Sequence, residues 1–181
     1  DHFSKYLKTQ ELSYIFEHKA GDKLMVDFAG KKLQIIDYET GEVTQVEFFV
    51  GVLACSGYTF GMACQSQQSP DFLGCLGACL ESIGGVPSAI VTDNLKPAVT
   101  KASKYDPEIN HSMADFAQHY DTVVLPTRAY SPKDKALVEG AVKILYTRVY
   151  AQLANKTFYS IHELNAAITE LVERHNNMAY Q

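Results

Sequence analysis

Three acidic residues stand where metal-dependent chemistry on a phosphodiester would need them. Asp27 interrupts an apolar run, Asp93 closes a second one, and Glu139 lies within a stretch of helical periodicity. A carboxylate among strand-core residues is costly to desolvate unless a partner compensates its charge. Two Mg²⁺ ions, about 3.5–4 Å apart, would compensate it, activate the attacking oxygen and stabilise the leaving oxygen of an in-line displacement. The three residues therefore predict a two-metal polynucleotidyl transferase centre, in which Mn²⁺ would substitute for Mg²⁺.

The surroundings of Glu139 are typical of a helix face that meets nucleic acid. Lys135 and Lys143 lie four residues before and after it, on nearly the same face. Such a face would present one carboxylate to a metal while two ammonium groups reach the flanking phosphates.

A structural role is the competing interpretation of each acidic residue. Strand Asp residues often cap turns, and a helical Glu with Lys four residues away is ordinarily a solvated ion pair. Five further Asp residues stand beside turn or helix-start signals and are interpreted as structural: Asp37, Asp71, Asp106, Asp121 and Asp134. His111 and His119 lie on an expected amphipathic helix, where a histidine is more often a packing or surface residue than a catalytic one.

The elements that must position these residues follow from hydrophobic periodicity. Alternating or short buried patterns predict strands over 23–27, 32–37, 43–54, 58–64, 88–92 and 122–125. Periods near 3.6 predict helices over 69–83, 106–120, 134–153 and 160–175. Ser69 is the expected N-cap of the first helix, with Pro70 at its first position and Gly84-Gly85 at its end. Ser160 is the expected N-cap of the last helix.

The order of these elements predicts an α/β fold. Turns between the early strands imply an antiparallel meander of three strands. Single buried strands followed by helices imply parallel crossovers, so the five-stranded sheet should be mixed, with flanking helices. We divide the chain into an N-terminal arm or linker (1–19), a catalytic core (20–155) and a C-terminal helical appendage (156–181). The apolar stripe of the appendage suits packing on its own core or on a neighbour.

The distribution of charge bears on nucleic-acid binding. The net charge of −5 is unfavourable for a DNA-binding protein, because phosphate contacts come mostly from Lys and Arg. However, residues 51–95 contain no Lys or Arg, whereas residues 96–148 hold eight of the sixteen. The candidate DNA contacts in that segment are Lys96, Arg128, Lys133, Lys135 and Lys143. We expect weak binding by this chain alone and most of the affinity from other domains.

Cysteine usage and the absence of a long apolar run indicate the cellular compartment in which the protein is expected. The cysteines are Cys55, Cys64, Cys75 and Cys79; none forms a CxxC pair or stands at zinc-ligand spacing with a His. We therefore expect buried free thiols in a reducing compartment. No apolar stretch reaches the ~18–20 residues of a membrane span, and the N-terminus lacks both signal-peptide character and an initiator Met. We expect a cytoplasmic protein without a membrane partner, excised from a longer chain.

Three segments resemble the catalytic motifs of DDE transposases and retroviral-type integrases. They are Val26–Gly30 (VDFAG), Val91–Lys96 (VTDNLK) and Tyr130–Lys143 (YSPKDKALVEGAVK). The resemblance covers roughly residues 20–155, and the nearest match is to the IstA-type transposases of bacterial insertion sequences. It implies an RNase H-like fold, with Asp27, Asp93 and Glu139 as the catalytic metal ligands.

The same resemblance implies a reaction and its partners. Water would first free 3′-hydroxyls at the transposon ends, and these hydroxyls would then join target phosphodiesters without a covalent protein intermediate. The implied partners are transposon-end DNA, target DNA, a second transposase subunit and an AAA+ helper ATPase, in the cytoplasm of a bacterium. Two alternatives stay open: an RNase H-like hydrolytic nuclease, and a non-catalytic module for assembly or DNA bridging.

Overall fold

A computed structural model describes residues 19–92, 99–101, 108–109, 111–126, 132–153 and 155–178 of the chain. For 99–101, 108–109, 126 and 132–138 it describes the backbone alone. The expected N-terminal arm, apart from its last residue, therefore lies outside the described residues.

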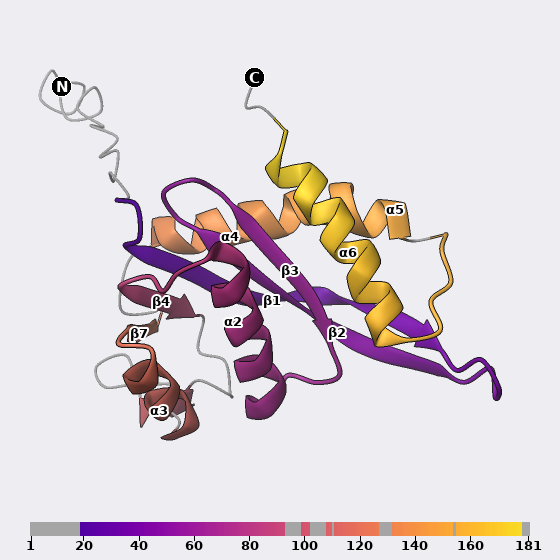
Figure 1. Cartoon of the computed structure of the whole chain (residues 1–181), viewed down its shortest axis with the longest axis horizontal. Coiled ribbons are helices and arrows are strands. Elements are labelled where there is room, and N and C mark those ends of the chain that lie inside the picture. The colour runs from indigo at the N-terminus through magenta and orange to yellow at the C-terminus, as the bar shows by residue number, and fades with distance from the viewer. Residues whose placement is uncertain are drawn as a thin grey trace, which may run out of the picture.

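A five-stranded sheet forms the centre of the fold, with its strands in the order β3-β2-β1-β4-β7 (Figure 1). The strands are β1 (Lys23–Ile36), β2 (Val43–Leu53), β3 (Thr59–Cys64), β4 (Ala89–Thr92) and β7 (Val123–Pro126). β2 pairs antiparallel with both β1 and β3, whereas β4 runs parallel to both β1 and β7. The predicted mixed α/β sheet, a meander followed by parallel crossovers, is confirmed.

β1 is one long strand, not the two extended pieces expected over 23–27 and 32–37. Its register with β2 shifts between Ala29, which pairs with Phe48, and Leu33, which pairs with Val46. The three residues between these pairs on β1 thus face a single residue of β2, Glu47. A bulge absorbs the extra residues and leaves the strand intact, because pairing resumes on its far side.

The segment before β7 differs from the helix expected over 106–120. α3 covers only His111–His119, and Glu108–Ile109 forms β6, which pairs with β5 (Val99–Lys101) in a separate two-stranded sheet. A strand of two residues is too short to show a period, so pairing with β5 alone decides its conformation.

One face of the sheet is covered by α2 (Ser69–Ile83) and α3. Leu24, Val26 and Phe28, alternate residues of β1, pack there with buried side chains of both helices. Because successive strand residues point to opposite faces, the residues between them belong to the other layer.

α2 begins one residue earlier than predicted. Gln68 is the N-cap, so Ser69 is the first helical residue. The side chain that organises the entry is Ser66, whose Oγ accepts the Gln68 N–H (3.2 Å) and donates to Asp71 Oδ2 (2.5 Å). The predicted end is confirmed, since Gly84 adopts a left-handed φ of 69°, a conformation that glycine reaches without steric cost.

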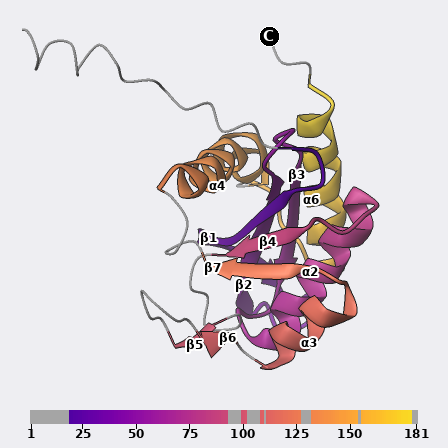
Figure 2. The same ribbon diagram turned by 90° about the vertical axis from the view of Figure 1, so that its left-hand side faces the viewer.

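The opposite face is covered by a long helical segment and by α6 (Ile161–Asn176). α4 (Pro132–Leu145) continues through a π-helix, η2 (Tyr146–Tyr150), into α5 (Ala151–Leu153). Figure 2 shows α4 on one side of β1, β4 and β7, with α2 and α3 on the other. The long helix expected over 134–153 is confirmed, although its change of period at η2 was not predicted.

α6 packs on the core of its own chain and covers the outer edge of β3. Its N-cap is Ser160, as predicted, and its apolar stripe is buried against the sheet. Asn165 accepts the Ala63 N–H (2.7 Å) and donates to the Ala63 carbonyl (2.9 Å). Asn176 makes the same pair of bonds with Thr59 (2.9 and 2.7 Å). These amides satisfy backbone groups that an edge strand would otherwise expose.

The cysteines agree with the prediction at three positions out of four. Cys64, Cys75 and Cys79 are buried free thiols, and burial raises the pKa of Cys79 to about 12. Cys55 is also free but lies exposed in the turn after β2, where it has no core to enter. Within the described part of the chain, no helix combines the length and apolar character that a membrane span requires.

Candidate active site

Asp27 lies on the central strand, on the face that α4 covers. Its neighbours at alternate positions, Met25 and Ala29, are both buried in the layer beneath α4, η2 and α6. Asp27 itself is half-buried, and its Oδ1 accepts the N–H of Phe28 at 2.8 Å. The backbone therefore fixes one carboxylate oxygen of a residue that stands among apolar neighbours.

β4 runs beside Asp27 up to the second predicted position. Thr92, its last residue, pairs in parallel with Val26, the residue before Asp27. Asp93 lies outside the described residues, as do Lys96 and Arg128. The last described pair between β1 and β4 therefore joins the residues that directly precede Asp27 and Asp93.

Glu139 is an exposed residue of α4. Lys143, one turn later, is also exposed, whereas the side chains of Lys133 and Lys135 lie outside the described part. Between Glu139 and Lys143, Val142 packs against a small cluster formed by Met25, Ala54 and Val91. This contact places the Glu139 segment over β1 and β4, on the same side of the sheet as Asp27.

The structure describes two of the three members of the predicted triad, Asp27 and Glu139, whereas Asp93 lies outside the described residues. Among the residues that it describes, no three His, Cys, Asp or Glu side chains lie close enough to hold a metal ion. Asp27 and Glu139 lie on the same side of the sheet.

The two candidate histidines lie away from this side. α3 packs on the face opposite Asp27. His111 is largely exposed and pairs with Asp115 on the same helix (3.3 Å), and His119 contacts Tyr120 edge to face at 4.8 Å. Their interpretation as surface and packing residues agrees with these contacts.

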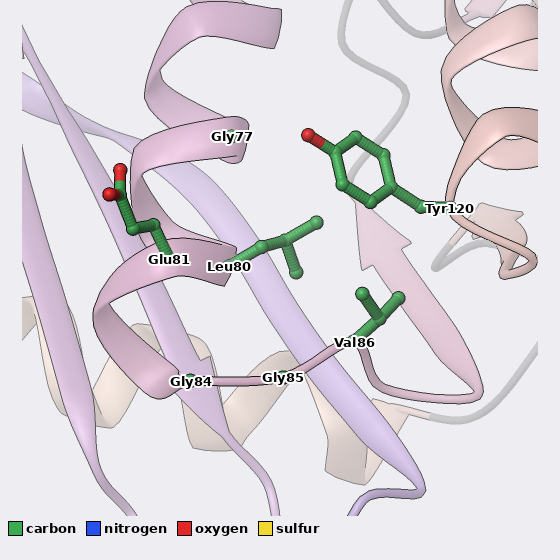
Figure 3. Close-up of a pocket in the computed structure, with 7 residues that line it drawn as sticks. All are labelled: Gly77, Leu80, Glu81, Gly84, Gly85, Val86 and Tyr120. Carbon is green, nitrogen blue, oxygen red and sulfur yellow. The ribbon is translucent and has the colours of Figure 1, made fainter.

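A pocket of about 440 Å³ opens on the α2 and α3 side (Figure 3). It is lined by Gly77, Leu80, Glu81, Gly84, Gly85, Val86 and Tyr120. Because α2 and α3 cover the face opposite Asp27, this pocket is separate from the candidate active site.

Two residues that the sequence reasoning missed join η2 to β1. Tyr146 Oη accepts the Lys31 N–H at 3.0 Å, and Tyr150 Oη donates to the Lys31 carbonyl at 2.5 Å. The sequence carries a signal for the π-helix that bears them, because apolar residues recur every fourth position from Ala141 to Leu153, a spacing too long for a regular α-helix.

Residues 17–132 match the model of a family described as "Integrase core domain". The match covers more than half of the chain; it includes Asp27 and Asp93 and ends before Glu139. The chain belongs to the integrase core domain family. This membership confirms the predicted class, the core of a polynucleotidyl transferase.

Relatives of this integrase core carry transposase names. "Putative transposase y4bL/y4kJ/y4tB" of Sinorhizobium fredii is 45% identical over 160 residues, which are 88% of this chain and 31% of that protein. "Putative transposase for insertion sequence IS1162" of Pseudomonas fluorescens is 36% identical over 181 residues, which are 100% of this chain and 32% of that protein. The predicted resemblance to insertion-sequence transposases is confirmed, and the chain spans about a third of the length of these relatives.

Solved integrase cores share the fold. The catalytic core domain of BIV integrase superposes with a TM-score of 0.63 at 13% identity, over 91% of this chain and 87% of that one. The HTLV-2 integrase catalytic core domain in complex with magnesium gives 0.61 at 15% identity, over 89% and 88%. At such identities the likeness concerns the fold alone, and it confirms the RNase H-like architecture.

Proposed function

We propose that this integrase core is the catalytic domain of a DNA transposase, which cleaves transposon 3′ ends and joins them to target DNA. The observation that carries the proposal is the setting of Asp27. A half-buried carboxylate stands on the central strand of an integrase fold, beneath the helix that bears Glu139. A carboxylate in such a setting is stabilised by a bound cation.

We propose Asp27, Asp93 and Glu139 as the ligands of two Mg²⁺ ions. Carboxylate oxygens are the donors that Mg²⁺ prefers, so the chemistry of this donor set fits the metal. When bound, the ions would activate the attacking oxygen and stabilise the leaving one. Asp27 would hold its position because the Phe28 amide orients one of its oxygens. The pairing of Val26 with Thr92 supports the proposal that Asp93 joins it.

The proposed DNA contacts are the cations that flank the acids: Lys96, Arg128, Lys133, Lys135 and Lys143. Lys143 is exposed one turn from Glu139, within reach of a phosphate next to the reacting one. The net charge of −5 limits the affinity of the chain by itself. We therefore assign most of the DNA affinity to the rest of a longer transposase, of which this chain would be about a third.

The proposed partners are transposon-end DNA, target DNA, further copies of the transposase and an AAA+ helper ATPase, in the bacterial cytoplasm. Relatedness to proteins named for insertion sequences supports the DNA partners. Self-association is supported by the HTLV-2 core, which is named in dimeric and trimeric forms. The helper ATPase rests on the sequence motifs alone.

A strand-transfer assay with the full-length transposase tests the proposal. Pre-cleaved transposon-end DNA is incubated with supercoiled target DNA and Mg²⁺, and joined products are counted. Asp27→Asn and Glu139→Gln should each lower joining by at least about 100-fold, because each removes a charged ligand. Glu173→Gln, the same substitution at an exposed position of α6, is the matched control and should join normally. Full joining by Glu139→Gln would refute the assignment.

The products separate the competing functions. A hydrolytic nuclease would leave nicked target without joined ends. A module for assembly or bridging would leave the target intact, and its thermal unfolding would not respond to Mn²⁺ or Mg²⁺ in a way that Asp27→Asn abolishes.

A further inference from the structure

The bulge of β1 is held by two tyrosines of the π-helix. The register shift between Ala29 and Leu33 takes the intervening residues out of the regular ladder with β2. Both backbone polar groups of Lys31, at the middle of the bulge, bond to Tyr146 and Tyr150. We call these two bonds the tyrosine clamp. It joins residues more than a hundred positions apart through the backbone of one residue, Lys31.

The clamp is anchored in the core at its helical end. Tyr150 is 5% exposed, and its ring packs edge to face on Phe48 with centroids 5.3 Å apart. Tyr146 and Tyr150 also contact each other, with ring centroids 4.8 Å apart. Burial, and then the neighbouring Tyr146, raise the pKa of Tyr150, so its hydroxyl stays protonated and donates to the Lys31 carbonyl.

The π-helix explains how one helical segment can place its tyrosines against Lys31 and also pack its apolar side chains in the core. Ala141, Leu145, Val149 and Leu153 all pack in the layer against the sheet, at intervals of four residues. In a regular α-helix each such step would rotate the side chain by about 40°, and the stripe would leave the sheet within three steps. A turn with i→i+5 bonds is wider and restores the alignment. The segment before η2, which bears Glu139, and the segment after it can then both face the sheet.

The tyrosine clamp fixes one point of the helix against one point of β1, and the positions of Glu139 and Asp27 can be measured from it. Glu139 precedes Tyr146 by seven residues, or about 10 Å along the helix and on nearly the same face. Asp27 precedes Lys31 by four residues, or at most about 13 Å along the strand, and the bulge shortens this span. α4 runs behind the sheet in roughly the same direction as β1 (Figure 1). Spans of similar length in one direction carry both acids toward the same end of the sheet.

We infer that Tyr146 and Tyr150 are positioning residues, which set the register of the Glu139 helix against the Asp27 strand by holding Lys31. The catalytic consequence rests on the proposed function, whereas the register itself does not. A slide of α4 by one turn, about 5.4 Å, would separate carboxylates that must share metal ions. The clamp would thus act on metal binding without touching metal or DNA.

The first arm of the test measures register without any activity. Spin labels are placed at exposed Lys143 and Thr44, as cysteine variants in a Cys55→Ser background, and the distance between them is measured by pulsed electron resonance. Tyr146→Phe combined with Tyr150→Phe keeps both rings and removes both hydroxyls. We expect a broadened or displaced distance distribution in this double variant. Tyr159→Phe, at an exposed ring of similar size, should leave the distribution unchanged. An unchanged distribution in the double variant overturns the inference.

The second arm uses the full-length transposase and titrates Mg²⁺ in the joining assay. Loss of one hydrogen bond should raise the Mg²⁺ midpoint by roughly 3- to 10-fold, with less effect on the rate at saturating metal. The double variant should shift the midpoint by less than the product of the single effects, because both bonds hold one residue. A purely structural role would lower the unfolding temperature and leave the midpoint in place, which overturns the catalytic part. If even the wild type joins no DNA, the proposed function has failed, and the spin-label arm still decides the clamp.

Discussion

Replacing Asn165 by alanine tests how much α6 stabilises the edge strand β3 through its hydrogen bonds to the strand backbone. The substitution removes both hydrogen bonds to the backbone of Ala63, which is 1% exposed and has little access to water as a replacement. Two buried backbone groups without partners cost about 2–4 kcal/mol together. We expect a loss of that size in the free energy of unfolding, measured by urea denaturation at pH 7. Amide hydrogen exchange at Ala63 should accelerate in parallel.

A matched control and a charge variant sharpen this prediction. Asn177→Ala makes the same change at an exposed helix end and should cost less than about 0.5 kcal/mol. Asn165→Asp keeps the acceptor for the Ala63 N–H but, when ionised, opposes the Ala63 carbonyl. Its folded pKa should therefore lie above the ordinary value near 3.9.

The pH dependence of the charge variant follows from that shift. A raised folded pKa means that the stability of Asn165→Asp, relative to the wild type, is regained below about pH 4 and lost as pH rises through the folded pKa. The reasoning is refuted if Asn165→Ala unfolds like Asn177→Ala, or if Asn165→Asp shows no such recovery in acid.

Three further outcomes are expected. Gly61→Ala should lower the free energy of unfolding by about 1–3 kcal/mol, since its Cβ would lie 2.8 Å from Phe48 Cζ in the packed core. Ser160→Ala should cost about 1 kcal/mol, because Ser160 Oγ accepts the Glu163 N–H at 3.1 Å as the N-cap of α6. Burial, and then the nearby Arg148, lower the pKa of His175, so the wild type should lose stability as pH falls from about 6.5 through that folded pKa, and His175→Gln should flatten this loss between pH 7 and 5.

The first two of these outcomes have a check in the same denaturation assay. Gly74→Ala, where nothing lies within 4 Å of the added Cβ, should be neutral or stabilising by up to about 1 kcal/mol. If Gly61→Ala behaves like Gly74→Ala, the packing around β3 is looser than the contacts indicate. Restored stability in Ser160→Asp, another N-capping residue, would separate the loss of the cap from a general effect of substitution.

Much of the fold was predictable because its cues are local. The end of α2 at Gly84 follows from the freedom of glycine at positive φ, and the start of α6 from the hydroxyl of Ser160. The meander and the parallel crossovers follow from turn residues and short apolar runs. The errors fall where neighbours decide: β6 exists through its pairing with β5, and β1 continues through a bulge because β2 remains beside it.

Some residues of the candidate site could likewise be predicted from local sequence, whereas their long-range contacts could not. Asp27 and Glu139 could be predicted as candidates because their sequence neighbours form an apolar run and a helical pattern, both of which are visible in the sequence alone. The match to the integrase core domain family confirms the class of protein that these motifs indicated. Nothing in the sequence showed that Tyr146 and Tyr150 would meet Lys31, because the bonds span 115 and 119 positions.

The amino-acid sequence by itself determined which residues could do chemistry, in what order they occur, and whether most neighbourhoods form a strand or a helix. Those properties depend on side chains within one or two turns of each other. Only the tertiary structure decided on which face of the sheet Asp27 lies, how a π-helix lets one helix reach both β1 and the core, and how α6 covers the edge of β3. These are contacts between distant segments, and their geometry arises only when the whole core packs at once.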